Sequence, residues 1–244
     1  MNYLISLLLI CYISQAGLAQ NRKIHLPKSR GSDTPETFWY SLLQERIKKF
    51  ELSHLQDSPH QFHLRLWTGN EILDIWKNQQ NILEGSLIMW AKEYADGPSR
   101  HFFKKYQVSS NQVAQVKNLI DSTQVLTIPS DSEIAKWRFG CDGITYKIEF
   151  SDAKNYYFKT YWTPSIQKDV AEAKIMRYFI QKIREKVNYE LLWRAFTPHI
   201  PYPSYIIGDG SYASVAVWSQ EKINLYRQKR REYLKSLKKK KRKK

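Results

Sequence analysis

The sequence predicts an α+β domain: an antiparallel β-sheet, built from a meander and further hairpins, that is packed by helices and followed by a basic C-terminal tail. Three observations lead to this prediction. Residues 137–164 contain two strand-like runs joined by a short polar loop, a helix with one apolar stripe follows them, and four more alternating runs precede them.

The two runs between Trp137 and Pro164 form the predicted central hairpin. In the second run, aromatic and β-branched residues fall alternately on two faces, the period of two that is typical of a strand. The polar segment 151–155 has the length of a hairpin loop, and Asp142-Gly143 favours a turn because glycine tolerates positive φ. Pro164 cannot donate to a strand ladder and ends the second strand.

The segment after Pro164 predicts a helix that covers this sheet. Its apolar residues recur at spacings of three and four, which places them in one stripe. They are Val170, Ala173, Met176, Phe179, Ile180, Ile183 and Val187. We expect the helix to continue through residues 188–196 and to end before Pro198.

The same region resembles a known group of proteins. The residues that carry the resemblance are Trp137, Gly140, Asp142-Gly143, Tyr146, Tyr157, Tyr161-Trp162 and Pro164, with Arg65-Leu66-Trp67 and residues 72–76 upstream. This pattern resembles uncharacterised exported proteins of Bacteroidota-type bacteria over roughly residues 38–195. The resemblance implies a bacterial, extracytoplasmic protein, and its motifs are structural rather than catalytic.

The first half of the chain predicts a helix and a four-stranded meander. Asp33 or Thr34 caps the helix, with Pro35 in its first turn. Residues 61–67 and 71–76 then alternate and pair across a turn that contains Gly69.

Residues 87–94 and 102–108 pair in the same way and complete the meander. Ser109 or Ser110 caps the next helix. Residues 202–218 predict a last hairpin across Gly208-Asp209-Gly210.

Residues 1–19 predict a signal peptide. The apolar run 4–13 is short for a membrane span, and Gly17-Leu18-Ala19 provides the small residues that precede a cleavage site. An uncleaved anchor is the alternative. Cleavage leaves Cys141 as the only cysteine, so no intramolecular disulfide is expected.

The net charge of +16 is concentrated at the C-terminus. From Lys222 onward the chain has thirteen Lys or Arg and one acid, a net +12, which leaves +4 for the rest. The predicted organisation is a signal peptide (1–19), a flexible polar leader (20–32), one α+β domain (33–218) and a basic tail (219–244).

The tail predicts electrostatic binding. Its basic run does not fold alone, but a weak apolar stripe precedes it on a cationic helix; the stripe residues are Ile223, Tyr226, Tyr233, Leu234 and Leu237. A basic amphipathic helix fits an anionic membrane surface, and its charge also fits acidic polysaccharide. A solvated, solubilising tail is the alternative. The candidate residues are Lys229, Arg230, Arg231, Lys235, Lys238, Lys239, Lys240, Lys241, Arg242, Lys243 and Lys244.

No constellation of residues demands a particular reaction. Cys141 beside Asp142 is a candidate nucleophile, but no histidine stands at a diagnostic spacing, and an inert half-buried thiol is the alternative. Asp142, Glu149 and Asp152 are candidate acid–base carboxylates, although the two aspartates stand where turns favour Asp.

Further candidate sites in the sequence are a histidine pair for a metal, a glycine-rich turn for a phosphate and an aromatic groove. His60-x-x-His63 suggests a metal pair, but residues three apart on a strand point to opposite faces, so the spacing suits a ligand pair only if His60 lies in the turn. We predict no metal or cofactor. Gly208-Asp209-Gly210 lacks the following Lys-Ser/Thr of a phosphate loop. An aromatic groove for carbohydrate or peptide is a further candidate, formed by Trp67, Trp76, Trp90, Tyr157 and Tyr161.

The sequence therefore predicts an exported, envelope-associated binding or structural protein without enzymatic activity, whose tail contacts anionic surfaces. One alternative is an envelope hydrolase that uses Cys141 or an acidic pair. Another is a cytoplasmic nucleic-acid binder, which requires that the N-terminus is not a signal. Because the signal peptide argues against nucleic acid, no specific nucleic acid is expected as partner.

Overall fold

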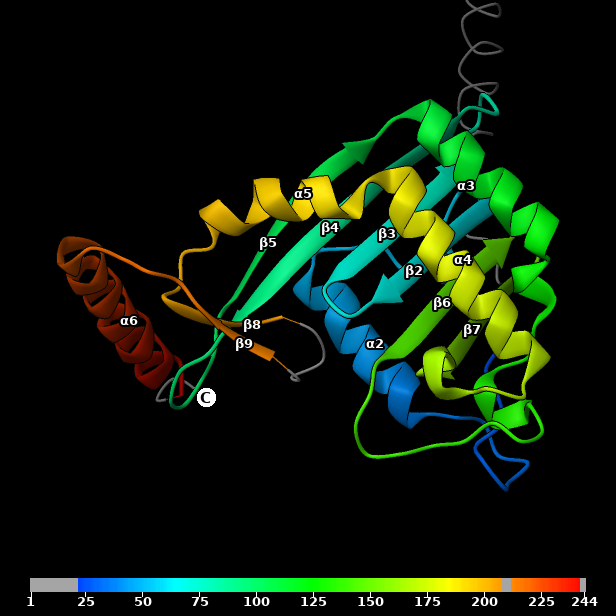
Figure 1. The fold of residues 1–244 in the computed structure, drawn as a ribbon, viewed down its shortest axis with the longest axis horizontal. Coiled ribbons are helices and arrows are strands. Elements are labelled where there is room, and N and C mark those ends of the chain that lie inside the picture. Colours follow the sequence, from blue (N-terminus) through cyan, green and yellow to red (C-terminus); the bar gives the residue numbers. More distant parts are fainter. Residues whose placement is uncertain (1–21, 208–211, 242–244) are drawn as a thin grey trace, which may run out of the picture.

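The computed structural model describes residues 22–207 and 212–241. Within them it has a largely antiparallel sheet of nine strands and five α-helices (Figure 1), which confirms the predicted α+β class. The strands are β1 (Lys23–His25), β2 (Phe62–Thr68), β3 (Glu71–Lys77), β4 (Leu83–Glu93), β5 (His101–Val108), β6 (Thr145–Asp152), β7 (Asn155–Trp162), β8 (Ser204–Ile207) and β9 (Tyr212–Val215). The helices are α2 (Phe38–Lys49), α3 (Ser110–Thr123), α4 (Ala171–Val187), α5 (Tyr189–Phe196) and α6 (Gln220–Lys241).

The predicted meander and central hairpin are both present. The sheet order is β1-β7-β6-β2-β3-β4-β8-β9, and β5 pairs with β4 as well. The β6–β7 hairpin lies antiparallel beside β2. Its turn is tighter than expected, because the Asp152 Oδ1 accepts hydrogen bonds from the backbone N–H groups of Lys154 and Asn155, both at 2.7 Å.

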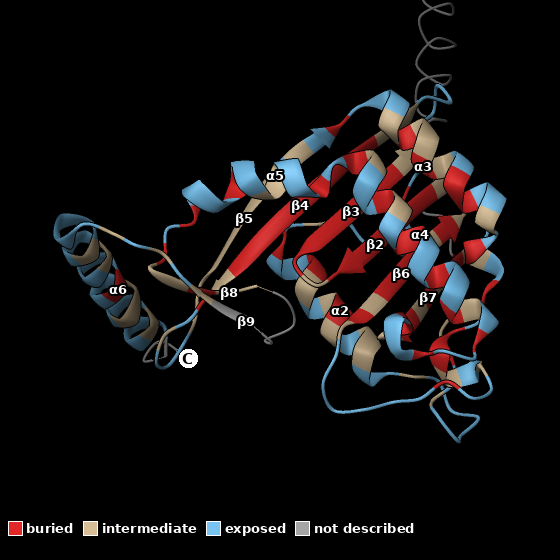
Figure 2. Cartoon of the chain, viewed as in Figure 1, coloured by how far each residue is buried: buried red, intermediate tan, exposed pale blue. Residues whose placement is uncertain are grey.

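One face of the sheet is covered by α3 and α4 (Figure 1). All seven residues of the predicted stripe after Pro164 are buried there, so this prediction is confirmed. Gly85 of β4 lets α3 approach closely: a Cβ at this position would lie 2.8 Å from the Ile75 Cγ2 and 2.9 Å from the Val113 Cγ2. Figure 2 shows the buried residues concentrated on the sheet and on the inner side of these helices.

The other face is covered by α2. Leu43, Ile47 and Phe50 pack there against Trp67 and Ile72 of the sheet. A row of buried polar side chains shares this face, which makes it chemically different from the α3–α4 face.

The prediction that residues 20–32 form a flexible leader is wrong for the described residues of that segment that form β1. Residues 23–25 form β1, which pairs parallel with β7 at the edge of the sheet. Arg22 fixes this strand, because its guanidinium donates to the carbonyl oxygens of Asp152 (2.5 Å), Gln56 (2.8 Å) and His60 (3.0 Å).

Two helix boundaries differ from the prediction. α2 begins at Phe38 rather than after Asp33 or Thr34, because the Glu36 Oε1 accepts the backbone N–H of Phe38 at 2.7 Å. The predicted continuous helix is interrupted at Asn188, whose φ of 60° ends α4 and starts α5 in a new direction (Figure 1).

The C-terminal strands β8 and β9 extend the sheet beside the end of β4, and α6 follows them. β8 pairs with the last residues of β4, and β9 pairs with β8, which confirms the last predicted hairpin. Gly208-Asp209-Gly210 lies outside the described residues. α6 lies at one end of the molecule, beside the tip of the β4–β5 hairpin (Figure 1).

Candidate functional site

α6 is attached to the domain through one buried carboxylate. Glu93, at the end of β4, accepts hydrogen bonds from the Arg230 Nη1 (2.6 Å), the Tyr226 hydroxyl (2.7 Å) and the Arg100 Nη2 (2.7 Å). Burial alone would raise the pKa of Glu93, but the hydrogen bonds from Arg100 and Tyr226 lower it below its ordinary value. The charged carboxylate therefore holds the two arginines and α6 together.

Arg230 is the correction to the predicted surface-binding set. It is 9% exposed, and besides Glu93 it binds two carbonyl oxygens of the β4–β5 turn, at 2.7 and 2.8 Å. Its charge is used inside the protein and is not offered to an outside anion.

Other basic residues of α6 are exposed. There are eight of them: Lys222, Arg227, Lys229, Arg231, Lys235, Lys238, Lys239 and Lys240. Two exposed acids, Glu221 and Glu232, share this surface. Lys241 ends the helix, and the predicted residues Arg242, Lys243 and Lys244 lie outside the described part of the chain.

The apolar stripe of α6 is turned toward the domain. Its five residues are partly buried and lie on the same side of the helix as Arg230. Tyr226 packs against the main core, and the Arg100 guanidinium lies 5.6 Å from its ring centroid and 5.4 Å from that of Tyr233. The stripe that we expected to face a membrane is therefore partly buried on the side of the domain, and binding to a membrane surface stays a prediction.

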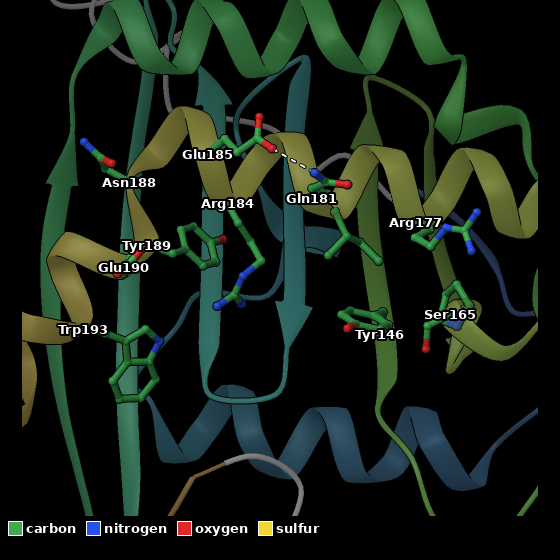
Figure 3. Close-up of a pocket in the computed structure, with 12 residues that line it drawn as sticks. Tyr146, Ser165, Arg177, Gln181, Arg184, Glu185, Asn188, Tyr189, Glu190 and Trp193 are labelled. Carbon is green, nitrogen blue, oxygen red and sulfur yellow. Dashed lines mark hydrogen bonds between the residues drawn. The ribbon is translucent and has the colours of Figure 1, made fainter.

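A groove lies beside α4 and α5 on the α3–α4 face (Figure 3). It has a volume of about 740 Å³, and aromatic walls alternate with charged and polar side chains. Arg184 reaches into it from α4, Trp193 from α5 and Tyr146 from β6 (Figure 3). None of these residues was predicted as a site, because one arginine and one tryptophan on neighbouring helices give no local signal.

The Glu71 carboxylate positions two of these side chains. Its Oε1 accepts hydrogen bonds from the Trp193 Nε1 (2.6 Å) and the Arg184 Nη1 (3.2 Å). Its Oε2 accepts from the Thr68 hydroxyl (2.6 Å). The β2–β3 turn thereby fixes the directions of the guanidinium and the indole.

A second cluster lies under α2. The Ser58 hydroxyl is 2.8 Å from the His63 Nδ1, and the His63 Nε2 is 2.7 Å from the Asp74 Oδ1. Burial alone would raise the pKa of Asp74, but Arg65 and His63 lower it to about 2. A Ser–His–Asp relay activates a serine only where a substrate reaches the hydroxyl, and Ser58 is 4% exposed.

This cluster continues across the sheet as a structural network. The Arg65 Nη2 donates to the Asp74 Oδ2 (2.9 Å), and the Trp67 indole and the Tyr156 hydroxyl both donate to Glu149 (2.7 and 3.0 Å). The sequence contained a signal for it, since His63, Arg65 and Trp67 alternate with apolar residues and so share one face.

The candidate carboxylates do not converge with Cys141. Cys141 and Asp142 are exposed in the segment before β6, whereas Glu149 is fully buried in the network. Asp152 caps the β6–β7 turn. The half-buried thiol that we considered as an alternative is therefore wrong, and no shared site forms.

His60 and His63 lie together but are not arranged as metal ligands. Their ring centroids are 5.5 Å apart, and both nitrogens of His63 already have protein partners. Among the described residues there is no group of three or more His, Cys, Asp or Glu that could hold a metal ion.

The five predicted aromatic residues do not line one groove. Trp67, Trp90 and Tyr161 are buried in the two cores, and the half-buried Trp76 and Tyr157 lie apart on β3 and β7. The aromatic side chains that line the groove beside α4 and α5 are Tyr146, Tyr189 and Trp193.

Comparisons of the chain with protein-family models and with curated proteins find no match. The resemblance to exported bacterial proteins therefore stays a prediction. In the part of the chain that the structure describes, no helix combines the length and the hydrophobicity needed to cross a membrane.

Proposed function

We propose that this protein is an exported, envelope-associated binding protein that attaches to anionic surfaces through the outward face of α6. The ligand chemistry is a dense array of phosphate or carboxylate groups, as on lipid headgroups or acidic polysaccharide. The export part of the proposal rests on the apolar run at residues 4–13, which lies outside the described residues.

One observation carries the binding part. Arg230 and the apolar stripe of α6 face the domain, and eight other basic side chains of the helix are exposed. A helix held in this way presents its charges as an ordered array and needs no further folding on contact. Each basic residue near an anionic surface contributes about 1 kcal/mol, so a few contacts suffice for reversible attachment.

Because the stripe is partly buried on the side of the domain, the proposed attachment is electrostatic and does not involve insertion of α6 into lipid. It therefore weakens steeply with salt. Nucleic acid would bind through the same charges without sequence preference, but it is not proposed as the natural partner of an exported chain.

The test removes four charges from the outward face and keeps the attachment at Glu93. In the α6 variant, Gln replaces four exposed basic residues: Lys229, Arg231, Lys235 and Lys238. In the matched control, Gln replaces four exposed lysines of the domain: Lys48, Lys105, Lys154 and Lys174. Both are sedimented with phosphatidylglycerol vesicles and, separately, with polygalacturonate.

We expect the α6 variant to lose most binding in at least one arm, by about 4 kcal/mol at low salt, while the control stays close to the parent protein. The arm that responds identifies the source of the anion. Equal losses in the variant and the control, or undiminished binding of both, would reject α6 as the binding surface.

A further inference from the structure

We propose that the groove between α4, α5 and the start of β6 binds a sugar that carries a carboxylate. The groove has a volume of about 740 Å³, which is the size of a small-molecule site. This proposal concerns a different surface from α6 and does not depend on it.

The charges of the groove favour an anion. Arg177 is exposed and has no hydrogen-bond or ion-pair partner among the described residues. Within the described residues the Arg184 guanidinium donates one hydrogen bond, to Glu71, which leaves most of its N–H groups without a protein acceptor there. The two arginines are seven residues apart on α4, so they lie on one side of the helix, about 10 Å apart along its axis.

The acidic residues at the groove do not cancel this charge. Glu185 is bound by Lys182 (2.6 Å) and Gln181 (3.0 Å), and Figure 3 shows it on the opposite side of α4 from Arg184. Glu190 is paired with Arg194 and is 80% exposed. Only Glu71 faces a groove arginine, so the pair Arg177 and Arg184 leaves one unbalanced positive charge.

The walls favour a ring compound over a simple inorganic anion. The Trp193 indole is held at its Nε1 by Glu71, which fixes the ring and leaves its face beside the groove, and Tyr146 lies across from it (Figure 3). Aromatic faces of this kind stack against the C–H face of a sugar ring. A guanidinium fork matches a planar carboxylate with two parallel hydrogen bonds.

Tyr189 supplies an independent observation. Its side chain is fully buried at the wall of the groove beside Arg184, and its hydroxyl has no hydrogen-bond partner among the described residues. Buried hydroxyls are normally paired. Burial raises the pKa of this phenol well above its ordinary value, so the hydroxyl stays protonated and lacks an acceptor in the described part of the chain.

The proposal is tested by ligand-observed NMR titration of the full chain with D-glucuronate, D-glucose and acetate. The parent protein, Arg177→Gln, Trp193→Leu and the matched control Lys174→Gln are compared; Lys174 is exposed on α4 and does not line the groove. The four-Gln α6 variant is titrated as well, since α6 also attracts carboxylates.

We expect saturable 1:1 binding of glucuronate, with glucose and acetate each about tenfold weaker or more. Arg177→Gln weakens glucuronate binding about tenfold, whereas Lys174→Gln and the α6 variant stay within about twofold. Arg177 is exposed, so this variant tests the site even where Trp193→Leu perturbs folding.

Four results would overturn the proposal. They are the absence of saturable glucuronate binding up to roughly 10 mM, equal affinities for glucuronate and glucose, acetate binding as tight as glucuronate, and binding that disappears in the α6 variant. The last result would assign the carboxylate to α6 and leave the surface-binding proposal intact.

Discussion

Single charged residues decide how this fold is held together. Glu93 joins α6 to β4, Glu71 orients the groove, and Asp74 and Glu149 order the polar row under α2. Glu93, Glu71 and Glu149 accept hydrogen bonds from elements far apart in the sequence, whereas the donors to Asp74 come from the neighbouring strand β2. Arg230 could not be distinguished from its twelve basic neighbours in the sequence, because its role depends on a partner more than 130 residues away.

Glu93→Gln tests the attachment of α6. The substitution leaves Arg230 and Arg100 without their countercharge, which costs roughly 3 kcal/mol or more for a buried pair. We expect the amides of α6 to exchange hydrogen much faster and the free energy of unfolding to fall. Glu221→Gln, at an exposed position of the same helix, is the control. Unchanged α6 exchange would show that Glu93 does not hold the helix.

His101 predicts a pH dependence of stability. Burial, together with Lys49, Lys92 and Arg46, lowers its pKa to about 4, against about 6.5 in an unfolded chain. Between these values the unfolded chain binds the proton and the folded one does not. The free energy of unfolding therefore falls as the pH is lowered from 6.5 to 4, and it levels off below 4.

The comparison of the parent with His101→Gln isolates this effect. It is necessary because burial raises the pKa of Asp131 to about 6, which stabilises the fold as the pH falls from 6 to 4. We expect the difference in free energy of unfolding between the parent and His101→Gln to change by about 2 kcal/mol between pH 6.5 and pH 4, after allowance for the partial exposure of His101. Parallel stability curves would contradict the assignment.

Cys141 predicts ordinary thiol reactivity. It is exposed, with no hydrogen-bond or ion-pair partner in the described residues, so a thiol reagent labels it without denaturation. We expect the rate at which the reagent labels Cys141 in the folded protein to be no higher than in the unfolded chain at the same pH. A rate tenfold or more above that value would indicate an activated thiolate and revive the hydrolase alternative.

At the scale of elements, the sequence was informative wherever the signal was local. The alternation in β2, β3 and β7 and the stripe of α4 follow from burial of one face, and the structure confirms them. β1 could not be predicted, because a three-residue strand is formed by its partner β7 and by Arg22. The groove arises from the interruption at Asn188, which the helical pattern does not reveal.

Gly85→Ala tests the close contact between β4 and α3. The new Cβ would lie under 3.0 Å from the methyl groups of Ile75 and Val113, both of which are buried. Overpacking of this kind costs about 1–3 kcal/mol. Urea denaturation should show a lower midpoint with an unchanged slope, whereas Gly97→Ala, where a Cβ meets open space at φ 77°, should be affected by backbone strain alone.

At the scale of the molecule, a domain region of low net charge carries one strongly cationic helix at its end (Figure 1). The charge asymmetry was visible in the sequence, but the side of α6 that it occupies was not. Because the apolar stripe is partly buried on the side that contacts the domain, the exposed surface of α6 is mainly basic, with Leu225 as an exposed apolar residue. Contact with anionic surfaces is therefore proposed to be electrostatic.

The most direct test of this account is the salt dependence of polygalacturonate binding by the parent chain and the four-Gln α6 variant. If each lost contact releases roughly 0.7 counterion, as on a single-stranded polyanion, the slope of log affinity against log salt should be shallower in the variant by about two to three. The four-Gln control on the domain should keep the parent slope. Identical slopes for the parent and the α6 variant would contradict the claim that the outward face of α6 makes the contact.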